Sequence, residues 1–416
     1  MPTSPTSAKK VCILGAGPHG LAAAVHLRRA DPDLDIVTVD PSGEWLTGWH
    51  EQFARAEIDA LRSPIVHHPA PDPYALSDFV TERKLARSGL PYDPPTTVAF
   101  GSFCRDLAEA SGLPAPLAGR VEAVRRDDRG LQILTEGAEI RADNLVVATN
   151  PHRRSIPEWV WPLLGSQPGL IAYGSDVDLR TTPDLQGRRV VIVGGGLTAA
   201  HLACGAAARG AEVTMVTRRA LETRDFDTEP GWLGPRFLTA FGQDDDPASR
   251  LRTALQARGG GTVPPWMRAR LNALVGDGRL ALSEDRCIRA ADVDQDGACV
   301  LALDDQTTLV ADHVWLATGT TPDLVAARCL ADLVADVPAV GGLPVTDENL
   351  RLGPHPIHVM GRLAILTLGP AAGNLWGAQR AAMRITRALT GIDLQHRSMA
   401  SVPPPGRSST PPTGRR

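Results

Sequence analysis

The chain has very little lysine. Only Lys9, Lys10 and Lys84 occur, which leaves 40 arginines among the 43 basic residues of this 416-residue sequence. Two of the three lysines stand next to the N-terminal tail, so a Schiff-base lysine or the lysine of a phosphate-binding P-loop has almost no place in the chain. The sequence therefore argues against both chemistries.

Paired cysteines are missing as well. The six cysteines show neither a Cys-x-x-Cys motif nor a spacing typical of metal ligands. They are scattered along the chain: Cys12, Cys104, Cys204, Cys287, Cys299 and Cys329. We expect reduced, structural cysteines and no metal site. Disulfide reduction through a local dithiol is disfavoured for the same reason.

Large charge and long apolar runs are also absent. The net charge of −4 offers no basic face for nucleic acid. No apolar stretch reaches the length needed to cross a bilayer, and the N-terminus is too polar for a signal peptide. We expect a soluble, cytoplasmic protein with no membrane partner. Residues 1–9 and 397–416 are rich in small polar residues, Pro or Arg, and we expect disordered tails there.

What the sequence does contain is two glycine-rich dinucleotide fingerprints. Gly15-Ala16-Gly17-Pro18-His19-Gly20 follows the apolar run 11–14 and leads into a helical pattern over 21–27. Gly194-Gly195-Gly196-Leu197-Thr198-Ala199 follows 190–193 and precedes a helix of small residues. Glycines at such a turn let the backbone approach a pyrophosphate, which then lies on the amides at the start of the helix. Two such turns predict two bound nucleotides.

The residue that ends the next strand distinguishes the two sites. Strand 36–39 ends at Asp40, where a carboxylate would hydrogen-bond the hydroxyls of an unphosphorylated ribose, as in FAD or NAD. Strand 213–217 ends at Arg218 and Arg219, which suit the 2′-phosphate of NADPH. The alternative is that the glycines serve only the turns and the two arginines are a solvated pair.

An internal repeat predicts the architecture. Residues 119–150 and 278–319 each read as a β-meander that returns to a hydrophobic strand, ending in Ala148-Thr149-Asn150 and in Ala317-Thr318-Gly319. We predict an α/β protein with two Rossmann-like dinucleotide-binding domains of the three-layer ββα type. The FAD domain would comprise residues 10–160 and 321–396, and the NADPH domain residues 161–320 with an insert at 221–266.

Between the fingerprints the chain resembles a known family. Segments 49–53, 61–63 and 72–79 follow the order found in the class B flavoprotein monooxygenases, nearest the lysine/ornithine N-hydroxylating enzymes. The linker Tyr173-Gly174-Ser175-Asp176 resembles that family too. Arg62 stands where the family has Gln, and His67 where it has Lys.

The resemblance implies an FAD-dependent, NADPH-oxidising monooxygenase. It would transfer one oxygen atom of O2 to a small molecule through a flavin C4a-hydroperoxide, with N-hydroxylation of an amine as one reaction of this kind. An NADPH-dependent flavin oxidoreductase without oxygen insertion and a slow flavin-binding partner protein stay open as alternatives. We leave homo-oligomer formation open as well.

The candidate site residues fall into three groups. His50, Arg62 and His67 are the catalytic candidates, with a turn cap, an ion pair to Asp59 or Glu57, and a loop role as their respective alternatives. The cofactor candidates are Gly15, Gly17, Pro18, Gly20, Asp40, Trp49, Gly194, Gly196, Thr198, Ala199, Arg218, Arg219, Thr318, Gly319 and Asn374. Trp49 would stack on a cofactor or merely pack, and Asn374 would cap a helix that points at the flavin.

The insert supplies the substrate candidates. It is rich in aromatic residues, Gly and Pro, a composition typical of lids and pocket walls. We expect Asp225, Phe226 and Trp232 to contact substrate, with Asp225 meeting an amine or guanidine. The alternative is an excursion that packs only on the NADPH domain.

Overall fold

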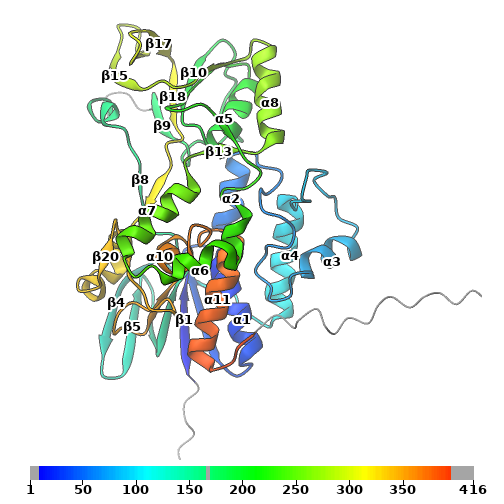
Figure 1. The fold of residues 1–416 in the computed structure, drawn as a ribbon, viewed down its shortest axis with the longest axis vertical. Coiled ribbons are helices and arrows are strands. Elements are labelled where there is room, and N and C mark those ends of the chain that lie inside the picture. The colour runs from blue at the N-terminus through cyan, green and yellow to red at the C-terminus, as the bar shows by residue number, and fades with distance from the viewer. Residues whose placement is uncertain (1–8, 165–168, 395–416) are drawn as a thin grey trace, which may run out of the picture.

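The same parallel sheet is built twice in the computed structural model, which describes residues 9–164 and 169–394 (Figure 1). The first sheet runs, in spatial order, through β22 (Ile357–Val359), β7 (Asn144–Val147), β1 (Lys10–Leu14), β2 (Asp35–Asp40) and β3 (Leu117–Ala118). The second runs through β9 (Ile171–Tyr173), β18 (His313–Leu316), β10 (Arg189–Val193), β11 (Glu212–Val216) and β14 (Leu280–Ser283). The predicted α/β fold with two Rossmann-type sheets is confirmed.

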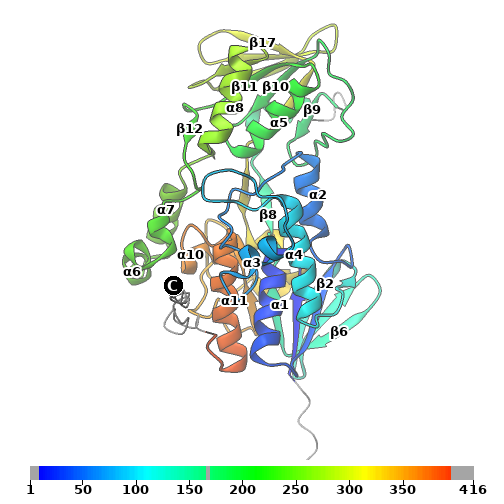
Figure 2. The same cartoon turned by 90° about the vertical axis from the view of Figure 1, so that its right-hand side faces the viewer.

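Helices cover one face of each sheet. In the first half, α1 (Pro18–Ala30) packs along α11 (Leu375–Thr390), as both views show (Figures 1 and 2). In the second half, α5 (Leu197–Ala208) packs beside α8 (Pro265–Gly276). Helix α5 consists largely of small residues because its neighbours approach closely: a Cβ added at Gly205 would lie 2.3 Å from the Leu179 side chain.

A three-stranded meander accompanies each sheet, as the repeat predicts. The first comprises β4 (Val121–Asp127), β5 (Gly130–Thr135) and β6 (Glu139–Ala142), and the second β15 (Ile288–Val293), β16 (Cys299–Leu303) and β17 (Thr308–Ala311). Alternate buried residues such as Leu131 and Ile133 attach the first meander to the core of its sheet.

The chain crosses between the halves on two short strands. β8 (His152–Arg154) leaves the first half and pairs antiparallel with β19 (Thr320–Pro322), which returns to it. Strand β22 then joins the first sheet beside β7, with Ile357 opposite Leu145. The first sheet thus combines strands from both ends of the chain, and the second sheet lies between them in sequence.

The remaining helices and strands of the described residues lie around these two sheets and in the insert. Around the first sheet these are α2 (Thr47–Arg55), α3 (Ala75–Glu82), α4 (Thr97–Ala110), α9 (Ala331–Val334), α10 (Ile365–Leu368), β20 (Ala339–Val340) and β21 (Leu343–Pro344). The insert contains β12 (Glu222–Thr223), α6 (Pro235–Gln243), α7 (Pro247–Arg258) and β13 (Thr262–Val263). The 3-10 helices are η1 (Glu158–Leu163), η2 (Pro230–Leu233), η3 (Leu324–Ala326), η4 (Arg328–Leu330) and η5 (Gly361–Ala364).

The insert reaches from the second half to the first. Phe241 of α6 and Ala254 of α7 are buried in the hydrophobic core of the first sheet, and Trp232 packs against that core. In Figure 2, α6 and α7 lie beside α10 and α11, while β12 and α8 remain in the upper half. The alternative of an excursion that packs only on the second half is therefore wrong.

None of the helices within residues 9–164 and 169–394 is both long and apolar enough to span a membrane. The predicted tails, apart from Lys9, lie outside the described residues.

Candidate dinucleotide sites and the cavity between them

The first fingerprint forms a tight strand-to-helix turn. Gly15 has a φ of +97°, a conformation that favours glycine, and lies against Thr149 of the first Ala-Thr-Asn turn. A Cβ added at Gly20 would lie 1.9 Å from the Gly15 carbonyl oxygen, so this position requires glycine for helix and strand to pack. At Gly17, by contrast, no atom lies within 4 Å of an added Cβ. The space beside Gly17 is open, as the approach of a pyrophosphate requires.

The start of α1 fits an anionic group. Gly17 is the N-cap residue and supplies no side-chain cap, and Pro18 occupies the first turn, where its missing N–H costs nothing. The first free amides of α1 therefore keep capacity for a ligand. Asp40 ends β2 beside this turn, where its Oδ2 accepts from the Ala16 amide at 3.0 Å. The site thus has the geometry of a dinucleotide-binding turn.

The second fingerprint repeats that geometry. Gly194 has a φ of +143°, and a Cβ there would lie 2.3 Å from the Ala317 carbonyl oxygen. Gly196 is the N-cap of α5, again with no side-chain cap. Thr198 and Ala199 follow in the first turn of this helix, with Thr198 lining the neighbouring cavity and Ala199 buried.

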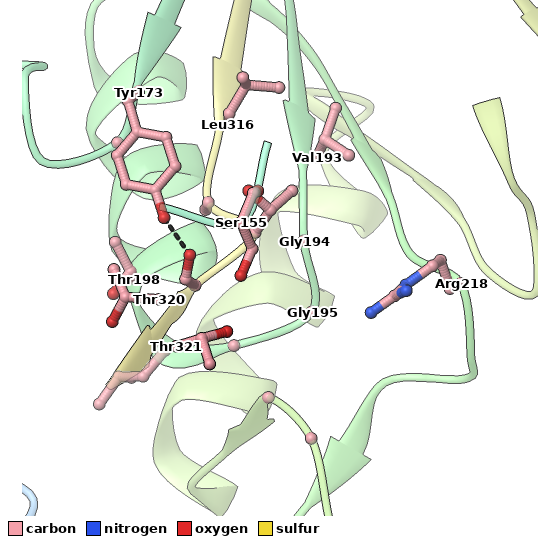
Figure 3. Close-up of a pocket in the computed structure, with 18 of the residues that line it drawn as sticks. Ser155, Tyr173, Val193, Gly194, Gly195, Thr198, Arg218, Leu316, Thr320 and Thr321 are labelled. Atoms are coloured by element: carbon pink, nitrogen blue, oxygen red, sulfur yellow. Dashed lines mark hydrogen bonds between the residues drawn. The ribbon is translucent and has the colours of Figure 1, made fainter. Parts of the chain in front are cut away.

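Arg218 and Arg219 lie at the end of β11, beside this second turn. Both are exposed and both line the cavity. Figure 3 shows Arg218 pointing into the pocket, toward Gly194 and Gly195. Within the described residues, neither guanidinium has an ion pair with a carboxylate. Both guanidiniums therefore remain available for a phosphate group, as the predicted binding of the 2′-phosphate of NADPH requires.

The second Ala-Thr-Gly turn closes one side of the same cavity. Thr318 Oγ1 donates to the Ser155 carbonyl oxygen at 2.5 Å, and the Tyr173 hydroxyl donates to the Gly319 carbonyl oxygen. These bonds join the turn to Ser155, which follows β8, and to the end of β9. They hold Thr318 and Gly319 at the crossing between the halves.

The cavity measures about 1620 Å³ and lies between the two halves. The second half contributes Gly194–Thr198, Arg218, Arg219 and the turn at Thr318. The insert contributes Asp227, Arg258 and the loop Gly259–Thr262, and the first half contributes Arg62, Arg362 and Ile365. The first fingerprint and Asp40 do not line it. A volume of this size accommodates a dinucleotide end together with a small molecule.

Arg62 joins the first half to the insert. Its guanidinium donates to the carbonyl oxygens of Arg224, Asp225 and Thr262 and pairs with Asp227 at 2.7 Å. The side chain is only 12% exposed. The alternative for Arg62, an ion pair with Asp59 or Glu57, is not formed: within the described residues Arg62 pairs with Asp227, and Glu57 pairs with Arg209.

The aromatic and histidine candidates of the first half lie outside the cavity lining. Trp49 stacks on Phe53 with 4.3 Å between ring centroids and also contacts Phe100, which matches the packing alternative. His50 packs so closely on Gly101 that a Cβ there would lie 2.2 Å from its ring. His67 is half-buried. Desolvation lowers the pKa of both histidines, so both are neutral at pH 7.

The substrate candidates of the insert also lie outside the cavity lining. Asp225 contributes its carbonyl oxygen to Arg62, and Phe226 packs on Tyr92 at 5.0 Å between ring centroids. Trp232 packs on Phe237 and Phe241. Their neighbour Asp227 does line the cavity. The structure therefore brings the insert to the cavity through residues other than the three predicted.

Helix α11 begins at the predicted place. Asn374 is its N-cap residue, and its side chain accepts no capping hydrogen bond from the helix. Gly361 lies close to His19 of the first fingerprint, since a Cβ there would be 3.6 Å from the His19 ring. The N-termini of α1 and α11 and the turn at Gly361 thus surround one region of the first half.

Two features of the cavity were not predicted. The loop Gly259–Gly261 lies on the second fingerprint, where a Cβ at Gly261 would be 2.6 Å from the Gly196 nitrogen. The Gly-Gly-Gly run indicates that another segment approaches this backbone closely, but the sequence alone does not identify that segment. The second feature is Arg362, whose side chain lines the cavity from the first half.

The cysteines agree with the expected structural role. All six are described, all are free thiols, and Cys12, Cys104, Cys204 and Cys299 are buried. Burial raises the pKa of Cys12 to about 12 and that of Cys299 to about 11, which disfavours the reactive thiolate. Within the described part of the chain, no group of three or more His, Cys, Asp or Glu is placed to hold a metal ion.

A family model described as pyridine nucleotide-disulphide oxidoreductase matches residues 12–244, more than half of the chain. The chain belongs to this family. The predicted oxidoreductase class is thereby confirmed. Comparison with curated protein sequences gives no match.

Several solved structures share the fold along nearly the whole chain. The FAD-bound cadaverine monooxygenase DfoA of Erwinia amylovora superposes with a TM-score of 0.75 at 18% identity, covering 97% of this chain and 100% of that one. Ornithine hydroxylase PvdA of Pseudomonas aeruginosa gives 0.73 at 17% identity, covering 92% and 99%. The Kutzneria sp. 744 ornithine N-hydroxylase KtzI, solved with reduced FAD, NADP+ and L-ornithine, gives 0.74 at 16%, again covering 92% and 99%. The predicted resemblance to N-hydroxylating flavoproteins is confirmed for the fold.

Proposed function

We propose that this protein is an FAD-dependent, NADPH-oxidising monooxygenase that acts on a small molecule. The observation that carries the proposal is the large cavity, which links the second dinucleotide turn to residues of the first half. The family match and the FAD- and NADP-bound relatives support the two cofactors.

FAD belongs in this proposal to the first half, residues 10–160 and 321–396. The open space beside Gly17 would admit its pyrophosphate, and Asp40 would meet its ribose. NADPH belongs to the second half, residues 161–320, with Gly196 at its pyrophosphate and Arg218 and Arg219 at its 2′-phosphate. When bound, FAD would accept hydride from NADPH and then supply the oxygen chemistry that places one atom of O2 on the substrate.

The protein's own residues position the reactants and exclude water. The Arg62 hydrogen bonds hold the insert against the first half, so the insert covers the cavity from one side. The Tyr173 and Thr318 bonds hold the crossing strands on another side. We assign Arg62 a positioning role, because its guanidinium is already occupied by four partners. Walls on these two sides would limit the access of water to a reactive oxygen species.

A reductase that inserts no oxygen is the competing function. Turnover of the purified yellow protein with NADPH separates the two, using ornithine, lysine and cadaverine as probe amines under 18O2. Hydroxylated product that carries one 18O atom and forms in proportion to NADPH consumed supports the monooxygenase. NADPH oxidation that yields only hydrogen peroxide with every probe points to the reductase, and a colourless protein contradicts both.

A further inference from the structure

Arg362 is a half-buried cation without a carboxylate partner. Its guanidinium donates to Thr320 Oγ1 at 2.6 Å and to the Thr320 carbonyl oxygen at 2.5 Å. No Asp or Glu among the described residues forms an ion pair with it. Burial, with Arg258 nearby, lowers the pKa of Arg362 to about 10, so the group still carries its charge at neutral pH.

Arg258 is the second cation at this place. It donates to the Pro370 carbonyl oxygen at 2.9 Å, and its nearest carboxylate is Asp227 at 3.6 Å. That carboxylate is bound more closely by Arg62, at 2.7 Å. Arg62 and Arg258 therefore share one carboxylate, Arg362 has none among the described residues, and all four side chains line the same cavity.

The start of α11 adds to the positive field. The Arg362 side chain lies against Gly373, where an added Cβ would be 2.6 Å from its Cγ. Helix α11 begins immediately afterwards, and its N-cap Asn374 does not satisfy the first amides. The positive end of a helix of 16 residues thus stands beside an unpaired guanidinium. Uncompensated cations at a half-buried site are costly unless an anion joins them.

We propose that Arg362 and Arg258 form a binding site for a carboxylate or phosphate group of the substrate, so that the substrate is an anionic small molecule. The inference rests on the proposed function in taking the cavity as the place of the reaction. Arg362 extends from the first half to Thr320 on the crossing strand β19, where groups from both halves meet. Arg218 and Arg219 lie at the second turn and are left for the coenzyme.

Succinate binding to the flavin-loaded protein tests the site. Saturating NADP+ occupies the coenzyme site, and calorimetry compares succinate with its neutral analogue succinamide. We expect succinate to bind at least tenfold more tightly. R362Q and R258Q should each raise the succinate Kd about tenfold or more, because each removes a charge-assisted contact. The succinate Kd of R362K should lie between the Kd of these two variants and that of the unaltered protein.

Two control variants fix the interpretation. R289Q changes an exposed arginine that lines the same cavity, and R125Q changes one outside it. Both should leave the succinate Kd unchanged. Equal binding of succinate and succinamide, or no succinate binding, would overturn the proposal. A third outcome would also overturn it: the R362Q protein loses its flavin, and after FAD has been added back it binds succinate as tightly as the unaltered protein. Arg362 would then bind the phosphate of FAD and not an anionic substrate.

The measurement is independent of oxygen insertion. A protein that only reduces oxygen to hydrogen peroxide can still bind succinate through Arg362, so the proposed function can fail while this inference stands. Conversely, a protein that hydroxylates a neutral amine and does not bind succinate would support the proposed function and contradict this inference. If R362Q does not fold, R258Q and R362K decide the outcome.

Discussion

The two fingerprints form the same turn and differ in what faces it. Gly15 and Gly194 share a positive φ, and Gly17 and Gly196 both start a helix without a side-chain cap. Beside the first turn Asp40 is held by the Ala16 amide, whereas the second turn faces exposed arginines. In our proposal the turn provides a place for a dinucleotide, and the residue after the next strand provides the selectivity.

The halves also differ in which segments build their hydrophobic cores and in how their dinucleotide turns lie relative to the cavity. The first contains a core built from both ends of the chain and from two helices of the insert. The second keeps its own core and opens to the cavity through its turn. The insert therefore stabilises one half while its loop Gly259–Gly261 lies on the nucleotide turn of the other.

Replacing the open glycine of the first turn should have the largest effect. Gly17→Val places a branched side chain where the pyrophosphate must approach, although no protein atom lies within 4 Å of its Cβ. We expect a folded protein with essentially no flavin, measured by absorbance and by the cooperativity of thermal unfolding.

A matched variant separates binding from folding. Gly20→Ala puts a Cβ 1.9 Å from the Gly15 carbonyl oxygen, so it should destabilise the fold itself. If Gly17→Val protein were as yellow as the unaltered protein, FAD would have to lie elsewhere.

The connection between the halves should give the next largest effect. Arg62→Leu leaves three carbonyl oxygens of the insert without their donor and removes the closest partner of Asp227. We expect a loss of about 3 kcal/mol in the free energy of unfolding, because three carbonyl oxygens lose a hydrogen bond from a charged donor. Urea denaturation measures it.

Arg141→Leu serves as the control for Arg62→Leu. Arg141 pairs with Asp127 and Glu139 on the exposed edge of the first meander, where solvent screens the charges, so its loss should cost much less than the loss of Arg62. Equal costs for the two variants would mean that the Arg62 contacts contribute no more than a surface ion pair.

The coenzyme arginines sharpen the comparison of the two turns. Arg218→Ala combined with Arg219→Ala should raise the KM for NADPH and spare that for NADH, because only NADPH carries the 2′-phosphate. Lost charge-assisted contacts cost about 1.5–3 kcal/mol, or roughly ten- to a hundredfold. Steady-state reduction of the flavin with each coenzyme measures the ratio, and an unchanged ratio would mean that the pair binds something else.

Local patterns were enough to predict the sheets and turns. Apolar strands such as 190–193, each followed by glycines, determine a βαβ unit through contacts close in sequence. The partner of Arg62 could not be found in this way. Sequence neighbours suggested Asp59, but Asp227 lies 165 positions away and is brought near by packing of the insert. The aromatic side chains of the insert likewise indicate burial without indicating which half buries them.

The last effect we expect is a pH dependence of stability to which each half contributes one buried histidine. His68 in the first half and His201 in the second are buried, and burial lowers the pKa of each from 6.5 to about 4. The unfolded chain therefore binds more protons between pH 6.5 and 4, and stability should fall as the pH drops through that window. Each histidine should contribute on the order of 1–3 kcal/mol of this loss.

Variants of the two histidines test this expectation. His201→Leu and His68→Gln should each reduce the loss of stability between pH 7 and pH 4.5, and the Gln side chain keeps a donor for the Pro73 carbonyl oxygen. In the double variant the two reductions should add, because the histidines lie in different halves. The measurement is the free energy of unfolding at pH 7 and pH 4.5, with exposed His152→Gln as control. A slope unchanged in both variants would mean that other groups cause the acid sensitivity.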